Sequence, residues 1–224
     1  MTLNWLLLGV LALVSYLLGS IPTAIWISRT FFGDDVRNHG SGNAGSTNMY
    51  RAFGASAGVP TQIIDIGKAS LATSLPLIVP LMGYEVAAED GLGLLVAQLM
   101  CGVAAVLGHV YTIFAGFKGG KGVNCMLGMM LAIAPLACLA AVGAFLLMLF
   151  TVRMVSVGSM LGVVAFTTYQ LIVYINHREP RDAVLLGVGA LLIVLVVYTH
   201  RTNIQRILNG TESRVNFGGK KTDS

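Results

Sequence analysis

The feature that most constrains this chain is its series of long apolar stretches, separated by short polar segments. No Asp, Glu, Lys or Arg precedes Arg29, and an uncharged stretch of about 18 or more residues is typical of a transmembrane helix. A cleavable signal peptide would combine a basic start with a small-residue cleavage site after a shorter apolar core. The chain shows neither, so we expect residues 3–28 to form a retained span that Gly19-Ser20-Ile21-Pro22 kinks near its inner end.

Composition places the chain among integral membrane proteins. Hydrophobic residues make up 55% and charged residues 11%, whereas globular domains average about 25% charged residues. The net charge of +4 is spread over the polar segments, which argues for membrane topology and against a nucleic-acid partner. Cys101, Cys125 and Cys138 each stand alone in apolar sequence, so we expect neither a disulfide framework nor a metal site. We expect residues 1–224 to form one membrane-embedded domain.

The apolar stretches predict an all-α fold with clear spans at about 3–28, 61–82, 91–114, 155–175 and 183–199. A further stretch, 123–150, contains Pro135 and can form one long helix or two short ones. With a short helical hairpin around Pro135 the chain has seven transmembrane helices, and twelve of its fourteen Lys and Arg residues fall on one side. Because cytoplasmic loops are enriched in Lys and Arg, we favour the hairpin, with the N-terminus outside and the C-terminus cytoplasmic. The cytoplasmic face then carries the segments 29–60, 115–122 and 199–224.

The first cytoplasmic segment contains the run Ser41-Gly42-Asn43-Ala44-Gly45-Ser46-Thr47-Asn48, which Arg51 soon follows. Glycines let successive backbone N–H groups point at one spot, and such a nest binds anions. Residues 49–53 can form a short helix opened by Ser46 or Thr47, whose N-terminus would favour a phosphate. The alternative is a flexible polar loop between two spans, because Gly, Ser and Asn are common in loops.

Two further polar segments lie on the same predicted side. Lys118-Gly119-Gly120-Lys121-Gly122-Val123 is basic and Gly-rich, but it is not a nucleotide-binding P-loop, because glycine follows its second lysine where Ser or Thr is required. His200, Asn203 and Arg206 share one helical face if the last span continues, and Asn209-Gly210 then ends that helix. The alternative for this third segment is a basic juxtamembrane helix that contacts anionic lipid head groups.

Two charged pairs have simpler interpretations. Asp65 and Lys68 lie three residues apart at one end of a span, where they can pair with each other or reach a polar loop. His177 and Asp182 match the His-x4-Asp pattern of thioester-dependent acyltransferases, but Pro180 interrupts the pattern and the loop falls on the predicted outer side. We therefore interpret this loop as a solvated charged turn between two spans.

Together the three cytoplasmic segments offer backbone nests, cations and a histidine, without paired catalytic carboxylates or a zinc site. This set suits the binding of two phosphorylated groups at the lipid–water boundary. The runs 41–48, 118–123 and 200–212 resemble, in order and spacing, the three signature motifs of the bacterial acyl-phosphate:glycerol-3-phosphate acyltransferases. The Gly19–Pro22 segment matches as well, so the resemblance covers nearly the whole chain. Asn124 and Cys125 depart from it, since smaller residues are expected at these positions.

The resemblance implies a seven-helix enzyme of the bacterial inner membrane, with its active site on the cytoplasmic face and no cofactor. It would transfer an acyl chain from acyl phosphate to the 1-hydroxyl of glycerol 3-phosphate, giving lysophosphatidic acid and phosphate in phospholipid synthesis. Its partners would be these two substrates and membrane lipids, with the enzyme that produces acyl phosphate as a candidate protein partner.

Acyl phosphate already carries a good leaving group, so no covalent acyl-enzyme is required and catalysis rests on proximity and electrostatics. The expected catalytic residues are Ser41, Lys121, His200 and Asn203. The expected substrate-binding residues are Gly42, Asn43, Gly45, Ser46, Thr47, Asn48, Arg51, Gly119 and Gly120.

Each of these groups has an expected role. The run 41–48 would bind the acyl-phosphate head group, while Lys121, Arg51 and the backbone of 119–120 would hold the glycerol phosphate. His200 and Asn203 would orient or deprotonate the attacking hydroxyl, unless a substrate phosphate accepts the proton.

The competing function is that of a transporter for a phosphorylated solute. Such a protein needs polar groups or broken helices near the bilayer midplane, whereas here the charges gather at one predicted face. A lipid-binding scaffold without turnover is a third alternative.

Overall fold

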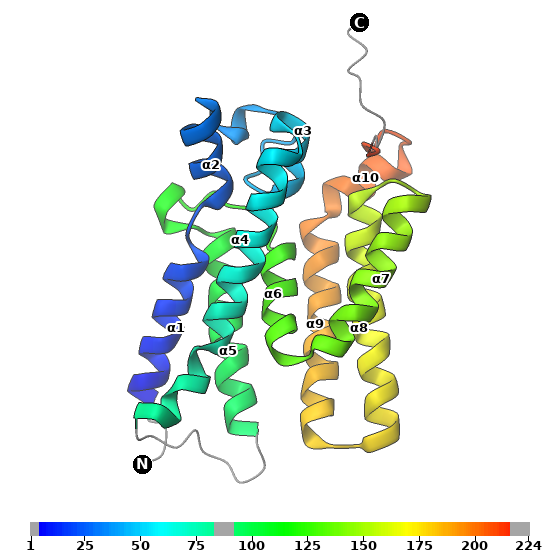
Figure 1. Cartoon of the computed structure of the whole chain (residues 1–224). Helices are drawn as coiled ribbons and strands as arrows, with labels where there is room; N and C mark the ends of the chain where they lie inside the picture. The colour runs from blue at the N-terminus through cyan, green and yellow to red at the C-terminus, as the bar shows by residue number, and fades with distance from the viewer. Residues whose placement is uncertain (1–4, 83–91, 216–224) are drawn as a thin grey trace, which may run out of the picture. The chain divides into compact units, whose positions relative to one another are not determined.

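In the computed structural model, which describes residues 5–82 and 92–215, every regular element is a helix (Figure 1). The predicted all-α fold is therefore confirmed over these residues. The predicted outer loop 83–90 and the end of the cytoplasmic tail, 216–224, lie outside the described residues. Backbone contacts divide the chain into two compact units, Met1–Pro135 and Leu136–Ser224. That the two units act together as one membrane-embedded domain remains a prediction.

The first unit is built from helices that the polar segments connect. Its α-helices are α1 (Trp5–Gly19), α2 (Thr23–Phe32), α3 (Ser46–Phe53), α4 (Ala55–Ser74), α5 (Leu92–Val110) and α6 (Val123–Ile133). Three 3₁₀ elements join them: η1 (Val36–Asn38), η2 (Leu75–Met82) and η3 (Ile113–Ala115). α1 packs against α5, and α4 packs against α3, α5 and α6.

Glycines permit the close helix crossings of the first unit. A Cβ atom on Gly19 of α1 would overlap the backbone of Ala105 in α5, and one on Gly128 of α6 would overlap the Ile66 carbonyl in α4. Small residues at crossings are the usual means by which membrane helices approach closely, because lipid tails give little hydrophobic drive for association.

The second unit contains α7 (Pro135–Thr151), α8 (Val155–His177), α9 (Pro180–Thr199) and α10 (Arg201–Leu208). α8 packs along α9. Between them Arg178 adopts a left-handed φ of 57° and Pro180 begins α9, where its missing N–H costs no hydrogen bond. This confirms that 177–182 includes the turn between two helices.

Five described segments are long and apolar enough to cross a membrane: Trp5–Phe32, Ala55–Val79, Leu92–Ala115, Val155–His177 and Pro180–Thr199. The first is broken at residues 20–22, as the Pro22 kink predicts. The stretch 123–150 forms two helices separated at Ala134. With 11 and 17 residues they are roughly 16 and 25 Å long, shorter than the hydrocarbon core of about 30 Å. The seven-span topology and its orientation remain predictions.

Candidate active site

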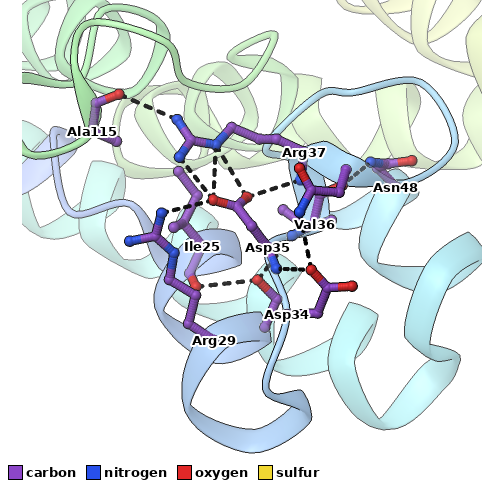
Figure 2. Close-up of polar contacts among 10 residues, drawn as sticks. Ile25, Arg29, Asp34, Asp35, Val36, Arg37, Asn48 and Ala115 are labelled. Carbon is purple, nitrogen blue, oxygen red and sulfur yellow. Dashed lines mark hydrogen bonds and ion pairs between the residues drawn. The ribbon is translucent and has the colours of Figure 1, made fainter.

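An acidic residue, Asp35, organises the start of the first polar segment by pairing with two arginines. Its Oδ2 atom lies 2.8 Å from Nη2 of Arg29 and 2.8 Å from Nη2 of Arg37. Figure 2 shows the two arginines on either side of the Asp35 carboxylate. The hydrogen bonds from Arg37 above all hold the pKa of the Asp35 carboxyl well below its usual range. Arg37 also donates from Nη1 to the Ala115 carbonyl at 3.4 Å, which ties this segment to the residues preceding the second one.

Asn48 fixes the shape of the loop that contains the first motif. Its side chain is buried, and its amide donates to the Val36 and His39 carbonyls, each at 2.9 Å. Its Oδ1 accepts from the Ser41 backbone N–H at 3.1 Å. Both amide hydrogens are thus used inside the protein, so Asn48 supports the loop in this structure, and its predicted contact with substrate stays untested.

The backbone after Gly42 offers a row of N–H groups. Gly42 itself takes a left-handed φ of 69° and donates to the His39 carbonyl. Within the residues that the structure describes, nothing accepts a hydrogen bond from the backbone N–H groups of residues 43–47. α3 begins at Ser46 with Gly45 as its N-cap, so no side chain caps its first turn, and the expected cap by Ser46 or Thr47 is wrong. Uncapped N–H groups at a helix N-terminus favour an anion.

The second polar segment lies on the C-terminal end of α5. Gly119 donates its N–H to the Val110 carbonyl at 3.1 Å, and Gly120 donates to the His109 carbonyl at 3.2 Å. A Cβ on Gly119 would overlap the His109 carbonyl, and one on Gly120 would overlap the His109 ring. The two glycines therefore let the loop cap α5, and their N–H groups are engaged within the protein, so their predicted grip on glycerol phosphate stays untested.

The first and second segments meet within the first unit. Asn124, at the start of α6, donates from Nδ2 to the Ser46 hydroxyl at 2.9 Å, and a Cβ on Gly120 would lie 3.1 Å from the Ala44 carbonyl. Asn124, a departure from the family motif, is thus a bridge between the two loops. Lys121 is half-buried in the second segment, whereas Arg51 on α3 is exposed.

A buried polar cluster lies beneath the second segment, and the sequence predicts only part of it. Lys68 of α4 places Nζ 2.8 Å from Asp65 Oδ1, 2.7 Å from the Ile21 carbonyl and 3.2 Å from His109 Nδ1. Of the two alternatives that the spacing of Asp65 and Lys68 left open, pairing with each other or reaching a polar loop, the structure shows the pairing. Sequence reasoning misses His109, because a lone histidine in an apolar helix gives no local signal of its partners.

Cys125 adds its sulfur to this cluster by donating to the Asp65 carbonyl at 3.4 Å. Ligand atoms of Asp65, His109 and Cys125 lie within 4.8 Å of one another, a spacing that could suit a metal ion. Lys68 Nζ, however, lies within 3.2 Å of both Asp65 Oδ1 and His109 Nδ1, so the lysine occupies the side of the cluster between these two ligand atoms.

The third polar segment belongs to the second unit, where His200 separates α9 from α10. The last helix is therefore interrupted at His200, contrary to the simple continuation considered above, and α10 ends before Asn209-Gly210 as expected. His200 is buried, and its Nδ1 lies 2.9 Å from the Val196 carbonyl. A carbonyl only accepts, so Nδ1 carries the proton, and in the neutral ring Nε2 holds the lone pair that a base needs.

Glu212 anchors this segment, and it is not among the expected site residues. Its buried carboxylate accepts from the Ser156 hydroxyl and the Asn203 amide, each at 2.8 Å, and from Arg206 Nε at 3.1 Å. Asn203 and Arg206 thus share a face, as their spacing predicts. Glu212 lies beyond the end of α10, so helical periodicity could not connect it to Asn203.

The sequence is similar to known glycerol-3-phosphate acyltransferases. A family model described as glycerol-3-phosphate acyltransferase matches residues 9–210. The glycerol-3-phosphate acyltransferase of Chlorobaculum tepidum is 40% identical over 223 residues, covering 92% of this chain and 96% of that protein.

Solved structures are similar too. The chain matches PlsY (YgiH), an integral membrane glycerol 3-phosphate acyltransferase in its glycerol 3-phosphate form, with a TM-score of 0.78, 32% identity and coverage of 93% and 96%. The lysophosphatidic acid form of PlsY matches with a TM-score of 0.74, 30% identity and coverage of 93% and 95%.

Proposed function

We propose, on the premise that the chain belongs to the glycerol-3-phosphate acyltransferase family, that it transfers an acyl chain from acyl phosphate to the 1-hydroxyl of glycerol 3-phosphate. The products would be lysophosphatidic acid and inorganic phosphate. That the chain is a membrane acyltransferase follows from the family itself. The donor, the acylated hydroxyl and the roles of individual residues are the proposal.

One observation supports acyl phosphate as the acyl donor. No described residue accepts a hydrogen bond from the backbone N–H groups of residues 43–47. They lead into the uncapped N-terminus of α3, where an anion is favoured. A phosphate directly beside the reacting carbonyl would use these donors. The half-buried Lys121, in the adjoining loop, would then neutralise the glycerol phosphate.

The reaction needs little covalent chemistry from the protein. The glycerol oxygen attacks the acyl carbonyl carbon, the bond between that carbon and the phosphate oxygen breaks, and phosphate leaves with the electron pair. The N–H groups of residues 43–47 would stabilise the negative charge on the leaving phosphate. His200 Nε2, or a substrate phosphate, would accept the hydroxyl proton. Asn203, held by Glu212, would orient the hydroxyl.

The expected setting is the bacterial inner membrane, with the polar segments facing the cytoplasm where glycerol 3-phosphate is available. Membrane lipids would surround the spans, and the enzyme that makes acyl phosphate is a candidate partner. The cytoplasmic orientation rests on the distribution of Lys and Arg.

The test is an assay of the detergent-solubilised protein with glycerol 3-phosphate and one of three donors: acyl phosphate, acyl-CoA or acyl carrier protein thioester. We expect lysophosphatidic acid from acyl phosphate and little from either thioester, because a thioester has no phosphate next to its carbonyl. Equal rates with a thioester would contradict the donor assignment. Failure to form product from any donor, combined with uptake of a phosphorylated solute into sealed vesicles, would favour a transporter.

A further inference from the structure

Three ionisable side chains that the proposed reaction does not use lie buried among the membrane-spanning helices of the first unit. Asp65, Lys68 and His109 expose only 1%, 6% and 7% of their surface. Ionisable groups in such segments are rare and usually functional, since their burial is costly. An ion pair of this kind is weak evidence for stability, because well-packed apolar residues often replace it at no cost.

The three side chains contact one another directly. Lys68 Nζ lies close to Asp65 Oδ1, the Ile21 carbonyl and His109 Nδ1. His109 Nδ1 also lies 3.6 Å from Asp65 Oδ1. The other ring nitrogen of His109, Nε2, faces Gly120, where an added Cβ would overlap it.

The cluster lies beneath the second polar segment and also contacts the break between α1 and α2. On one side, Lys68 donates to the Ile21 carbonyl at this break, and α2 connects the break to the first polar segment. On the other side, the His109 carbonyl accepts the Gly120 N–H, and the His109 ring lies against Gly120. Lys121 is the next residue along the chain, so a shift of His109 moves the base from which Lys121 extends.

We propose that Asp65, Lys68 and His109 are positioning residues that set the 119–121 segment, and with it Lys121, for binding glycerol 3-phosphate. The inference rests on the proposed role of Lys121. The cluster itself touches no substrate. It acts through the His109 ring and carbonyl on the loop backbone.

The decisive experiment is a double-mutant cycle between the cluster and Lys121. Asp65→Leu combined with Lys68→Met removes both charges and leaves neither unpaired. We expect this variant to raise the KM for glycerol 3-phosphate by about 10- to 100-fold, since a misplacement of about 1 Å can cost this much. Lys121→Ala added to it should raise KM little further, because the two changes act through one contact.

Thr73→Val is the matched control on the same helix, because Thr73 is also buried and its hydroxyl donates to the Ala69 carbonyl of its own helix. In the Thr73→Val background Lys121→Ala should keep its full effect. An unchanged KM in the folded cluster variant, or effects of the cluster and Lys121 that multiply independently, would overturn the proposal.

If the Asp65→Leu/Lys68→Met variant does not fold, two substitutions of His109 test the same proposal. His109→Gln keeps a donor near the Nε2 position facing Gly120, whereas His109→Asn keeps an acceptor near Nδ1 for Lys68 but loses the group at Gly120. We expect a larger KM for glycerol 3-phosphate in His109→Asn than in His109→Gln. Equal KM values would contradict the proposal, and so would a failure of every cluster variant to fold, since stability alone would then explain the burial.

Binding of glycerol 3-phosphate measured by titration calorimetry, without any acyl donor, separates this inference from the proposed reaction. If acyl phosphate is not the donor, the wild-type protein makes no product from it, yet the cluster variants should still bind glycerol 3-phosphate more weakly. If only the positioning role is wrong, the wild-type reaction proceeds and the variants bind as the wild type does.

Discussion

Two lysines of the first unit show how surroundings decide what a side chain does. Lys68 is buried, and its Nζ lies close to three polar atoms of the first unit. Lys121 is half-buried in a Gly-rich loop that adjoins the first motif. We propose that Lys121 serves a substrate phosphate in both the ground state and the transition state.

Substituting Lys121 should therefore weaken binding more than turnover. We expect Lys121→Ala to raise the KM for glycerol 3-phosphate by about tenfold to a hundredfold, which corresponds to a charge-assisted hydrogen bond of about 1.5–3 kcal/mol. Lys118→Ala, an exposed lysine of the same segment, is the control and should change KM little. Steady-state kinetics over a range of glycerol 3-phosphate concentrations check both, and a Lys121→Ala variant that lost only kcat would contradict the binding role.

His200 should behave in the opposite way, because a general base acts on the chemical step. We expect His200→Ala to lower kcat by roughly 10²–10⁴-fold and to abolish the acid limb of the pH–rate profile. His177→Ala, an exposed histidine at the end of α8, is the control and should leave the profile intact. If His200→Ala keeps the acid limb and loses only a few-fold in rate, His200 orients the hydroxyl and a substrate phosphate accepts the proton.

Sequence reasoning at this scale succeeds where partners are local and fails where they are distant. The spacing of Asp65 and Lys68 allows their pairing. Nothing in the sequence links either residue to His109, which lies on another helix, and helical periodicity does not pair Asn203 with Glu212, which lies beyond the end of α10 although both belong to the run 200–212. The Gly-rich pattern of 119–120 predicts phosphate donors, whereas these N–H groups first satisfy the carbonyls that end α5.

At the scale of helices, close crossings and breaks shape the first unit. α1 lies against α5 through Gly19, and α4 lies against α6 through Gly128. The break between α1 and α2 is predictable from Pro22, since proline cannot continue the hydrogen-bond ladder. Ala134 separates α6 from α7 just before Pro135, which fits the bias of the residue preceding a proline away from helical backbone.

A pair of glycines on α1 tests the crossing with α5. A Cβ on Gly19 would overlap the Ala105 backbone, whereas one on Gly9 meets nothing within 4 Å. We expect Gly19→Ala to lower the free energy of unfolding by about 1–3 kcal/mol, because backbone atoms cannot move aside as a side chain can. Gly9→Ala should be no less stable than the wild type. Thermal unfolding in a single detergent measures both, and equal stabilities would contradict the close crossing of α1 and α5.

At the scale of the whole molecule, the apolar segments and the positions of Lys and Arg together predict a membrane topology that can be tested. The structure describes five segments able to span and two shorter apolar helices. The choice of seven crossings comes from the positions of Lys and Arg, not from helix length. Element types follow from the apolar pattern, whereas the arrangement of the loops depends on tertiary contacts such as Asn124 with Ser46, which periodicity does not encode.

Cysteine labelling on intact cells should reveal the orientation. A membrane-impermeant thiol reagent should reach single cysteines introduced at 83–90 and 176–182, but not at 36–52, 117–122 or 203–215. The buried native residues Cys101, Cys125 and Cys138 should contribute little background. Permeabilised cells provide the control, because every introduced cysteine should then react. External labelling of 203–215 would contradict the seven-span topology.

The backbone donors at residues 43–47 also bear on how this enzyme can change in evolution. An N–H group belongs to every amino acid except proline, so substitutions at positions 43, 44 and 47 by other residues would leave the donors proposed to bind the phosphate in place. Selection to keep them would act instead on residues that shape the loop without offering it a charge, such as Gly42 with its left-handed φ and the buried Asn48. The chemistry of the site can thus persist while the side chains around it drift, provided that the fold of these few residues is maintained.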